Sequence, residues 1–173
     1  MKKILLLSLF VISAMLVIFN EKQNQPEQAV SEGLYAPDFE VSDTSAGDKV
    51  SLPELKGKVI FLHFWASWCD SCKGEMPSIE ALYRKMTDND NFRMITVIYK
   101  DDTESAVKFM SANGYSFPVY SDPKGKASKN YRVTGVPETF IIDKKGIIKR
   151  RAIGADEWSS PANNRFIGNL LSE

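Results

Sequence analysis

Two cysteines, spaced Cys69-x-x-Cys72, stand between two segments of different character, and this arrangement limits what the chain can fold into. Before them, residues 59–65 (VIFLHFW) form a short run of β-branched and aromatic residues, which predicts a strand buried on both faces. After them, apolar residues recur at helical spacing, which predicts a helix over residues 69–86. The cysteine pair is therefore expected where a buried strand passes into a helix.

Four kinds of site can use two cysteines at this spacing. A structural disulfide would close a very short loop and so add little stability. A zinc site needs four ligands, and the chain offers two cysteines and one histidine, His63, so no metal site is expected. Covalent haem needs a histidine directly after the second cysteine, where this chain has Lys73. The fourth interpretation, a redox-active pair, has a direct physical reason.

A helix that starts at Cys69 would direct its free N–H groups and its dipole at that sulfur, which favours the thiolate. A lowered thiol pKa makes Cys69 a good nucleophile at neutral pH. Cys72 lies one turn further along and could resolve a mixed disulfide formed by Cys69. We therefore expect Cys69 to attack and Cys72 to resolve, with no cofactor beyond their own redox-active disulfide.

The rest of the chain alternates between strand and helix patterns, which indicates an α/β domain with a mixed sheet. A hairpin near the end supplies the antiparallel part. Thr103 is the expected N-cap of the helix before Gly114. The expected elements are a helical turn at 51–55, strands at 59–65, 92–99, 118–120, 138–143 and 146–152, and helices at 69–86, 103–113, 126–131 and 158–171.

The first 33 residues are expected to lie outside this domain. Lys2 and Lys3 precede sixteen uncharged residues, 4–19, which at a helical rise reach about 24 Å. Residues 1–19 are therefore expected to be a signal anchor or a signal peptide that places the body outside the cytoplasm. Residues 20–33 are expected to form a flexible tether, and residues 34–173 the folded domain.

The overall charge argues against nucleic acid as a partner. The chain has 22 basic and 22 acidic residues and a formal net charge of zero. A nucleic-acid-binding protein would concentrate basic residues on one face or along one helix. We expect no nucleic-acid partner.

Several motifs together resemble one family. Residues 64–73 (FWASWCDSCK) look like a thioredoxin active-site segment. Their continuation through residues 74–77 (GEMP), the entry motifs APDF (36–39) and LPELKGK (52–58), and the segment GVPETFIID (135–143) resemble the TlpA/ResA-like branch. Residues 102–122 resemble the central insert of that branch. The resemblance extends from about residue 35 to the end of the chain.

This resemblance implies a thioredoxin fold with a TlpA/ResA-type N-terminal extension and central insert. It also implies a protein anchored to the outer face of the cytoplasmic membrane, which reduces disulfides of exported proteins. Apocytochrome c is a frequent substrate of the branch. A membrane electron donor would restore the dithiol.

The resemblance also points to residues around the cysteines. Pro137 matches the family's cis-proline, which would turn the Val136 backbone toward a substrate chain. Trp68 could form a substrate contact surface or could simply pack. His63 stands where the family usually has Asp or Asn, and could relay a proton or be a core histidine. Glu75 matches a family glutamate and could accept the Cys72 proton, or could be an exposed helix residue.

Two other functions remain open on the sequence alone. A peroxiredoxin-like thiol peroxidase would share the entry region, but the Pro-x-x-x-Thr/Ser-x-x-Cys motif of those proteins is absent around Trp65 and Ala66. A non-catalytic module could instead bind Cu(I) through the two thiols, or carry an apoprotein. Peroxide-driven turnover would favour the first, and tight copper binding without disulfide reduction would favour the second.

Overall fold

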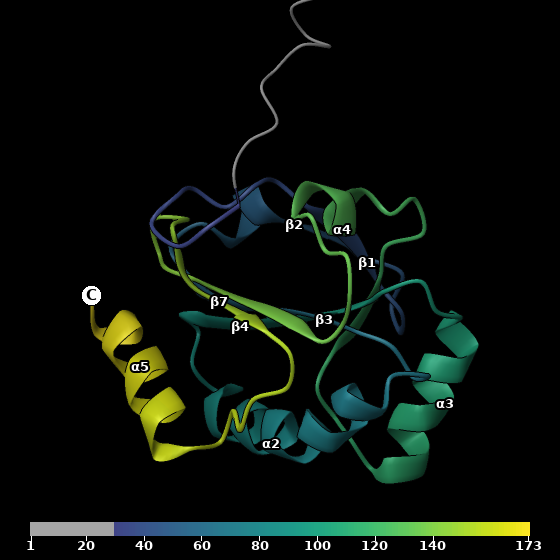
Figure 1. Ribbon diagram of the computed structural model, residues 1–173. Coiled ribbons are helices and arrows are strands. Elements are labelled where there is room, and N and C mark those ends of the chain that lie inside the picture. Colours follow the sequence, from purple (N-terminus) through teal and green to yellow (C-terminus); the bar gives the residue numbers. More distant parts are fainter. Residues whose placement is uncertain (1–29) are drawn as a thin grey trace, which may run out of the picture.

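A single seven-stranded sheet forms the centre of the computed structural model, which describes residues 30–173 (Figure 1). The strand order is β2-β1-β5-β4-β3-β6-β7. The β3 strand pairs in parallel with β4 and antiparallel with β6, so the sheet is mixed as expected. The strands are β1 (Glu40–Asp43), β2 (Lys49–Ser51), β3 (Val59–Trp65), β4 (Phe92–Ile98), β5 (Val119–Ser121), β6 (Glu138–Ile142) and β7 (Ile148–Ile153).

Helices cover both faces of the sheet (Figure 1). On one face lie α2, α3 and α5, and on the other lie α4 and the 3-10 helix η1. This confirms the α/β class. The helices are η1 (Leu52–Leu55), α2 (Asp70–Met86), α3 (Thr103–Asn113), α4 (Lys126–Asn130) and α5 (Pro161–Ser172).

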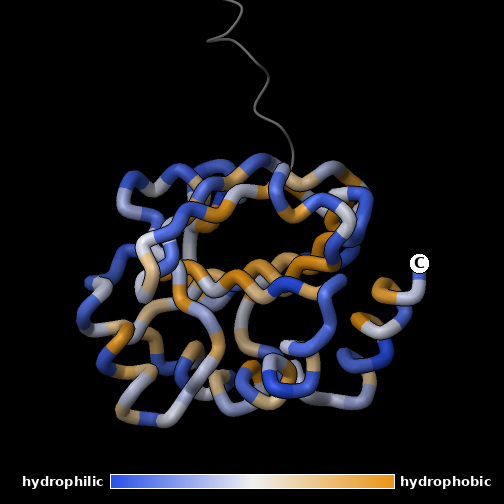
Figure 2. Tube along the Cα trace, turned by 180° about the vertical axis from the view of Figure 1, so that it is seen from behind, coloured by the Kyte–Doolittle hydropathy of each residue, from blue (hydrophilic) through white to orange (hydrophobic). Residues whose placement is uncertain are grey.

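The central β3 strand divides the core into two layers. All seven of its side chains are buried, and they alternate between the two faces of the sheet. Phe61 and Trp65 pack in the layer beneath α2, whereas Leu62 and Phe64 pack in the layer beneath α4. Figure 2 shows hydrophobic residues concentrated along the central strands. By the same alternation, the ring of His63 lies on the α2 side.

The structure corrects several element boundaries. The antiparallel β1–β2 hairpin was not predicted, because its short strands are polar and carry no clear alternation. Asp102, not Thr103, is the N-cap of α3, since its carboxylate accepts a hydrogen bond from the Ser105 amide at 2.9 Å. The last helix begins at Pro161, so Trp158 lies before it.

The chain already contacts the domain within the segment expected to be a tether. Val30 is only 4% exposed, and its carbonyl oxygen accepts a hydrogen bond from Arg151 at 2.9 Å. The Gly33 amide donates to the carbonyl oxygen of Ile148 at 2.8 Å, and the Glu32 carboxylate accepts from the Arg151 amide at 3.0 Å. Residues 30–33 therefore run along β7.

The expected signal anchor, residues 1–19, and most of the expected tether lie outside the described residues. Within residues 30–173, no helix has both the length and the apolar character needed to cross a membrane. Anchoring therefore stays a prediction from the sequence.

Candidate active site

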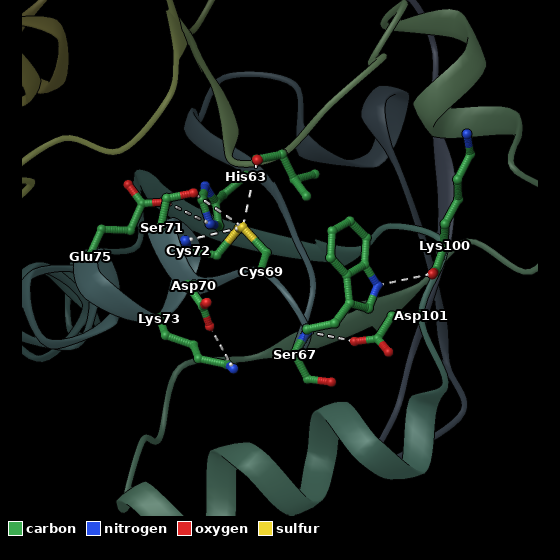
Figure 3. Close-up of a disulfide and its surroundings, with 12 residues drawn as sticks. His63, Ser67, Cys69, Asp70, Ser71, Cys72, Lys73, Glu75, Lys100 and Asp101 are labelled. Atoms are coloured by element: carbon green, nitrogen blue, oxygen red, sulfur yellow. Dashed lines mark hydrogen bonds and ion pairs between the residues drawn. A yellow bond between two sulfur atoms is a disulfide. The ribbon is translucent and has the colours of Figure 1, made fainter.

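The two cysteines form a disulfide at the first turn of α2 (Figure 3). Cys69 is the N-cap, with φ −91° and ψ 109°, and its Sγ accepts a hydrogen bond from the Cys72 amide at 3.1 Å. The helix therefore directs N–H groups at the Cys69 sulfur, as the sequence predicted. This arrangement favours negative charge on Cys69 once the disulfide is reduced.

The two sulfurs differ in their access to solvent. Cys69 is 5% exposed, whereas Cys72 is fully buried. The neighbours of Cys69 are open, because the Asp70 side chain is 97% exposed and Trp68 is 56% exposed. A partner protein can therefore approach the disulfide only from the Cys69 side.

Two oxygen atoms lie close to the Cys69 sulfur (Figure 3). The Ser71 hydroxyl is 3.4 Å from Sγ, and the Val136 carbonyl oxygen is 3.5 Å from it. The bond between Val136 and Pro137 is cis, as the family resemblance implied. The expected site residues on α2 and on the 135–143 segment are thus brought together, although 67 residues separate Cys69 from Val136.

Trp68 and Ser67 are held by the loop that follows β4. The Trp68 indole Nε1 donates a hydrogen bond to the carbonyl oxygen of Lys100 at 3.2 Å, and the Ser67 amide donates to the Asp101 carboxylate at 2.6 Å. These two bonds fix the turn between β3 and α2. Trp68 therefore keeps a defined orientation while more than half of its surface faces solvent, and it is not a packed core residue.

His63 and Glu75 lie on the interior side of the disulfide (Figure 3). Glu75 is buried, so it is not the exposed helix residue that was the alternative to a functional role. Its Oε1 lies 3.5 Å from the Nε2 of His63, and the Nδ1 of His63 lies 2.8 Å from the Thr139 hydroxyl. Within residues 30–173, Oε1 and Nε2 have no hydrogen-bond partner, so each faces mainly the other.

Burial shifts the pKa values of Glu75 and His63 in opposite directions, so that each side chain favours its neutral form. Burial raises the pKa of Glu75 to about 7, although its Oε2 accepts hydrogen bonds from the Asp156 amide at 3.1 Å and the Trp158 indole at 3.0 Å. Burial lowers the pKa of His63 to about 3. Near pH 6, the stable state of the pair is a protonated Glu75 beside a neutral His63.

Sequence reasoning missed the residues that support this site. Asp156 and Trp158 hold Glu75 from 81 and 83 residues away, and Asp101 holds Ser67 from 34 residues away. No local pattern in the sequence marks such contacts. Ser71 could have been noticed, because it lies between the two cysteines. Among residues 30–173, no group of three or more His, Cys, Asp or Glu side chains is placed to hold a metal.

Comparison with known proteins identifies the family of this chain. The model of the AhpC/TSA family matches residues 33–151. The thiol-disulfide oxidoreductase ResA of Bacillus thuringiensis is 40% identical over 123 residues, which cover 70% of this chain and 69% of ResA. The thioredoxin-like protein YneN of Bacillus subtilis is 35% identical over 132 residues, which cover 76% of each chain.

A solved structure gives the same result for the fold. The crystal structure of StoA from Bacillus subtilis matches with a TM-score of 0.63 at 27% identity, and the match covers 80% of this chain and 98% of StoA. The matched family segment includes the cysteine pair and the cis-proline. The chain therefore belongs to the AhpC/TSA family and, within it, to the ResA-type thiol–disulfide oxidoreductases.

Proposed function

We propose that this protein reduces disulfides in exported proteins, with Cys69 as the nucleophile and Cys72 as the resolving thiol. The observation that carries the proposal is the unequal access to the two sulfurs, since Cys69 stands at the helix N-terminus and Cys72 is fully buried. The two thiols supply both electrons of the reaction. Apocytochrome c is the substrate that the family resemblance favours.

The reaction is a pair of thiol–disulfide exchanges. In the reduced protein, the Cys69 thiolate attacks one sulfur of the substrate disulfide, and the other substrate sulfur leaves as a thiolate. The Cys72 thiolate then attacks Cys69 Sγ, and the second substrate sulfur leaves. Two electrons pass to the substrate, and the Cys69–Cys72 disulfide forms. A dithiol donor in the membrane reverses these exchanges on the protein and restores both thiols.

Glu75 is the proposed acceptor for the Cys72 proton. It lies one turn beyond Cys72 on α2 and is buried in the same region. A pKa of about 7 leaves comparable amounts of base and acid near neutral pH, which suits a group that must both accept and return a proton. His63 is proposed as a positioning residue: with its own proton on Nδ1, facing the Thr139 hydroxyl, its Nε2 would accept a hydrogen bond from the protonated Glu75 carboxyl.

Trp68 and Val136 form the proposed contact surface for the substrate chain. Trp68 offers an exposed aromatic face next to Cys69, and the Val136 carbonyl oxygen lies 3.5 Å from the Cys69 sulfur. An extended substrate segment could pair with the backbone at Val136. Pro137 sets the direction of that backbone.

The proposed location is the outer face of the cytoplasmic membrane. Residues 1–19 would anchor the chain, with Lys2 and Lys3 on the inner side. If the segment is cleaved, the same domain would be released as a soluble extracytoplasmic protein. Both placements put the disulfide where exported proteins pass.

A trapping experiment tests the roles of the two cysteines. Cys72→Ser should accumulate a mixed disulfide through Cys69 with an oxidised C-x-x-C-H peptide, which mimics a haem-attachment segment. Cys69→Ser and the double variant should trap nothing. If Cys69→Ser traps the peptide instead, the assigned roles are reversed. If the wild type consumes peroxide but leaves the peptide oxidised, the peroxidase function replaces this proposal.

A further inference from the structure

The connection from β7 to α5 passes beside α2 and reaches the buried carboxyl group of Glu75 (Figure 1). The Asp156 amide donates a hydrogen bond to Glu75 Oε2 at 3.1 Å, and the Trp158 indole Nε1 donates to the same oxygen at 3.0 Å. The other oxygen, Oε1, has no hydrogen-bond partner among residues 30–173 and faces His63. The two oxygens of one carboxyl group are therefore held in different surroundings.

This difference determines where the proton of Glu75 lies. A neutral carboxyl group has a single O–H, and an oxygen that accepts from N–H donors cannot direct its own hydrogen at them. Because Oε2 accepts from two donors, the proton of neutral Glu75 lies on Oε1. When this proton leaves, the two N–H donors on Oε2 stabilise the negative charge that remains.

Trp158 is itself fixed by the core and by α2. Its side chain is fully buried, and its ring packs edge-on against Phe61 with 4.9 Å between the ring centroids. Its amide donates to the Ser78 hydroxyl at 3.0 Å, and this hydroxyl donates to the carbonyl oxygen of Glu75 at 2.8 Å. The connection is thus joined to α2 through both backbone and side chain, and the indole N–H keeps its direction toward Oε2.

Three ionisable side chains lie around this carboxyl group: His63 on β3, Cys72 on α2 and Asp156 on the connection. The Asp156 carboxylate is 39% exposed and lies 4.0 Å from Arg150 of β7. Burial raises the pKa of Glu75 and the charge of Asp156 adds to this, whereas the two N–H donors lower it. The indole N–H is therefore one of two groups that favour the ionised carboxylate against its burial.

We propose that Trp158 positions Glu75 for the resolving step. Together with the Asp156 amide, it holds Oε2 of Glu75 and leaves Oε1 to take the proton of Cys72. The Cys72 sulfur then attacks Cys69 Sγ, the bond from Cys69 to the substrate sulfur breaks, and the substrate leaves as a thiolate. This inference rests on the proposed role of Glu75 as proton acceptor, and it adds a group outside α2 that sets the pH range in which the carboxyl group can act.

The first test follows the indole N–H signals of the oxidised wild type by NMR from about pH 5 to 9. The Trp158 signal should shift with a midpoint near pH 7, because its acceptor Glu75 loses a proton there. The shift should be absent in Glu75→Gln. Trp65 is the internal reference, since its buried Nε1 has no hydrogen-bond partner among residues 30–173. A Trp158 signal that stays constant while the carboxyl carbon of Glu75 titrates would overturn the inference.

The second test measures the rate of resolution against pH in Trp158→Phe, which keeps a buried ring but lacks the N–H donor. Loss of one hydrogen bond to a carboxylate should raise the midpoint of the pH profile by about one pH unit. Resolution should then be about fivefold slower at pH 7 and equal to that of the wild type above about pH 9. The matched control is Trp65→Phe, which makes the same replacement at another fully buried indole and should leave the midpoint unchanged.

The outcomes separate this inference from the proposed function. If resolution in the wild type does not depend on a group that titrates near pH 7, Glu75 is not the proton acceptor, and both statements about its carboxyl group fail. If the wild type shows this dependence but Trp158→Phe is slower by the same factor at every pH, Trp158 has only a structural role and this inference alone is overturned. Should Trp158→Phe not fold, the indole signal of the wild type decides.

Discussion

His63 Nε2 lies 3.5 Å from Glu75 Oε1, and both side chains are closed to solvent. The two residues come from β3 and α2, and the alternation of side chains along β3 turns the imidazole toward the helix. On folding, the proton that an unfolded chain would carry on histidine near pH 5.5 moves to the glutamic acid, because burial opposes both charges. The contributions of His63 and Glu75 to the free energy of unfolding therefore depend on pH in opposite directions.

The first prediction concerns stability against pH in the oxidised protein. His63 binds its proton only when unfolded between about pH 3 and 6.5, so its contribution to the free energy of unfolding rises with pH. Glu75 keeps its proton only when folded between about pH 4.5 and 7, so its contribution falls with pH. Between about pH 4.5 and 6.5 the two contributions cancel.

Single variants should uncover each contribution. Glu75→Gln should give a free energy of unfolding that rises by up to about 1.4 kcal/mol per pH unit between pH 4.5 and 6.5, relative to the wild type. His63→Asn should give a fall of similar size in the same window. Urea titrations at several pH values measure both. If the free energy of unfolding, relative to the wild type, changed with pH in the same direction in both variants, the assignment of a protonated Glu75 beside a neutral His63 would be wrong.

The second prediction concerns turnover. Glu75→Gln should slow the resolution of the mixed disulfide by about 100-fold at pH 7, because the Cys72 proton loses its acceptor. The dependence of that step on a group with a pKa near 7 should disappear, while the initial attack by Cys69 changes little. Rapid-mixing measurements of the released substrate thiol separate the two steps.

Glu80→Gln supplies the control for this second prediction. Glu80 is also buried on α2, but its carboxylate accepts from Ser116 and Phe117 and pairs with Arg84, away from the disulfide. Its loss should lower stability and keep the pH dependence of resolution. A change in that dependence in the Glu80 variant as large as in Glu75→Gln would remove Glu75 from the mechanism.

Local patterns predicted the central strands, α2 and the position of the cysteine pair, because buried strands and amphipathic helices have characteristic spacings of apolar residues. The β1–β2 hairpin has no such pattern, since its strands are three or four residues long and largely polar. The partners of Glu75 were also hidden, because Asp156 and Trp158 approach it only after α2 and the segment before α5 pack together. The family resemblance supplied Glu75 and Pro137, which spacing alone does not single out.

The third prediction concerns Trp68. Trp68→Ala should raise KM for a protein disulfide about tenfold, because an exposed aromatic contact next to the nucleophile is lost. The free energy of unfolding should change by less than about 1 kcal/mol, since the side chain is 56% exposed. Trp68→Phe keeps an aromatic face but loses the hydrogen bond to Lys100. Its KM should lie between those of the wild type and Trp68→Ala. An unchanged KM in Trp68→Ala would show that this surface does not contact the substrate.

The fourth prediction concerns the N-terminal residues. The full chain should fractionate with membranes, and a chain starting at Glu27 should be soluble, redox-active and as stable as the domain of the full chain. A chain starting at Leu34 should be about 2 to 4 kcal/mol less stable, because it loses the buried Val30 and the hydrogen bonds to Arg151. Denaturant unfolding of the two shortened chains gives the comparison. A natural N-terminus near residue 20 would show cleavage instead of anchoring.

The segment along β7 also affects how separate copies of the protein meet. As the last strand of the sheet, β7 would present unpaired amides and carbonyls to any other extended chain. The amides of Gly33 and Ala36 donate to the carbonyls of Ile148 and Gly146, and the Ile148 amide donates to Leu34. The incoming chain thereby blocks this edge against intermolecular strand pairing. A protein crowded at high local density on a surface would stay monomeric along this side, and removal of residues 30–36 would open a route to aggregation.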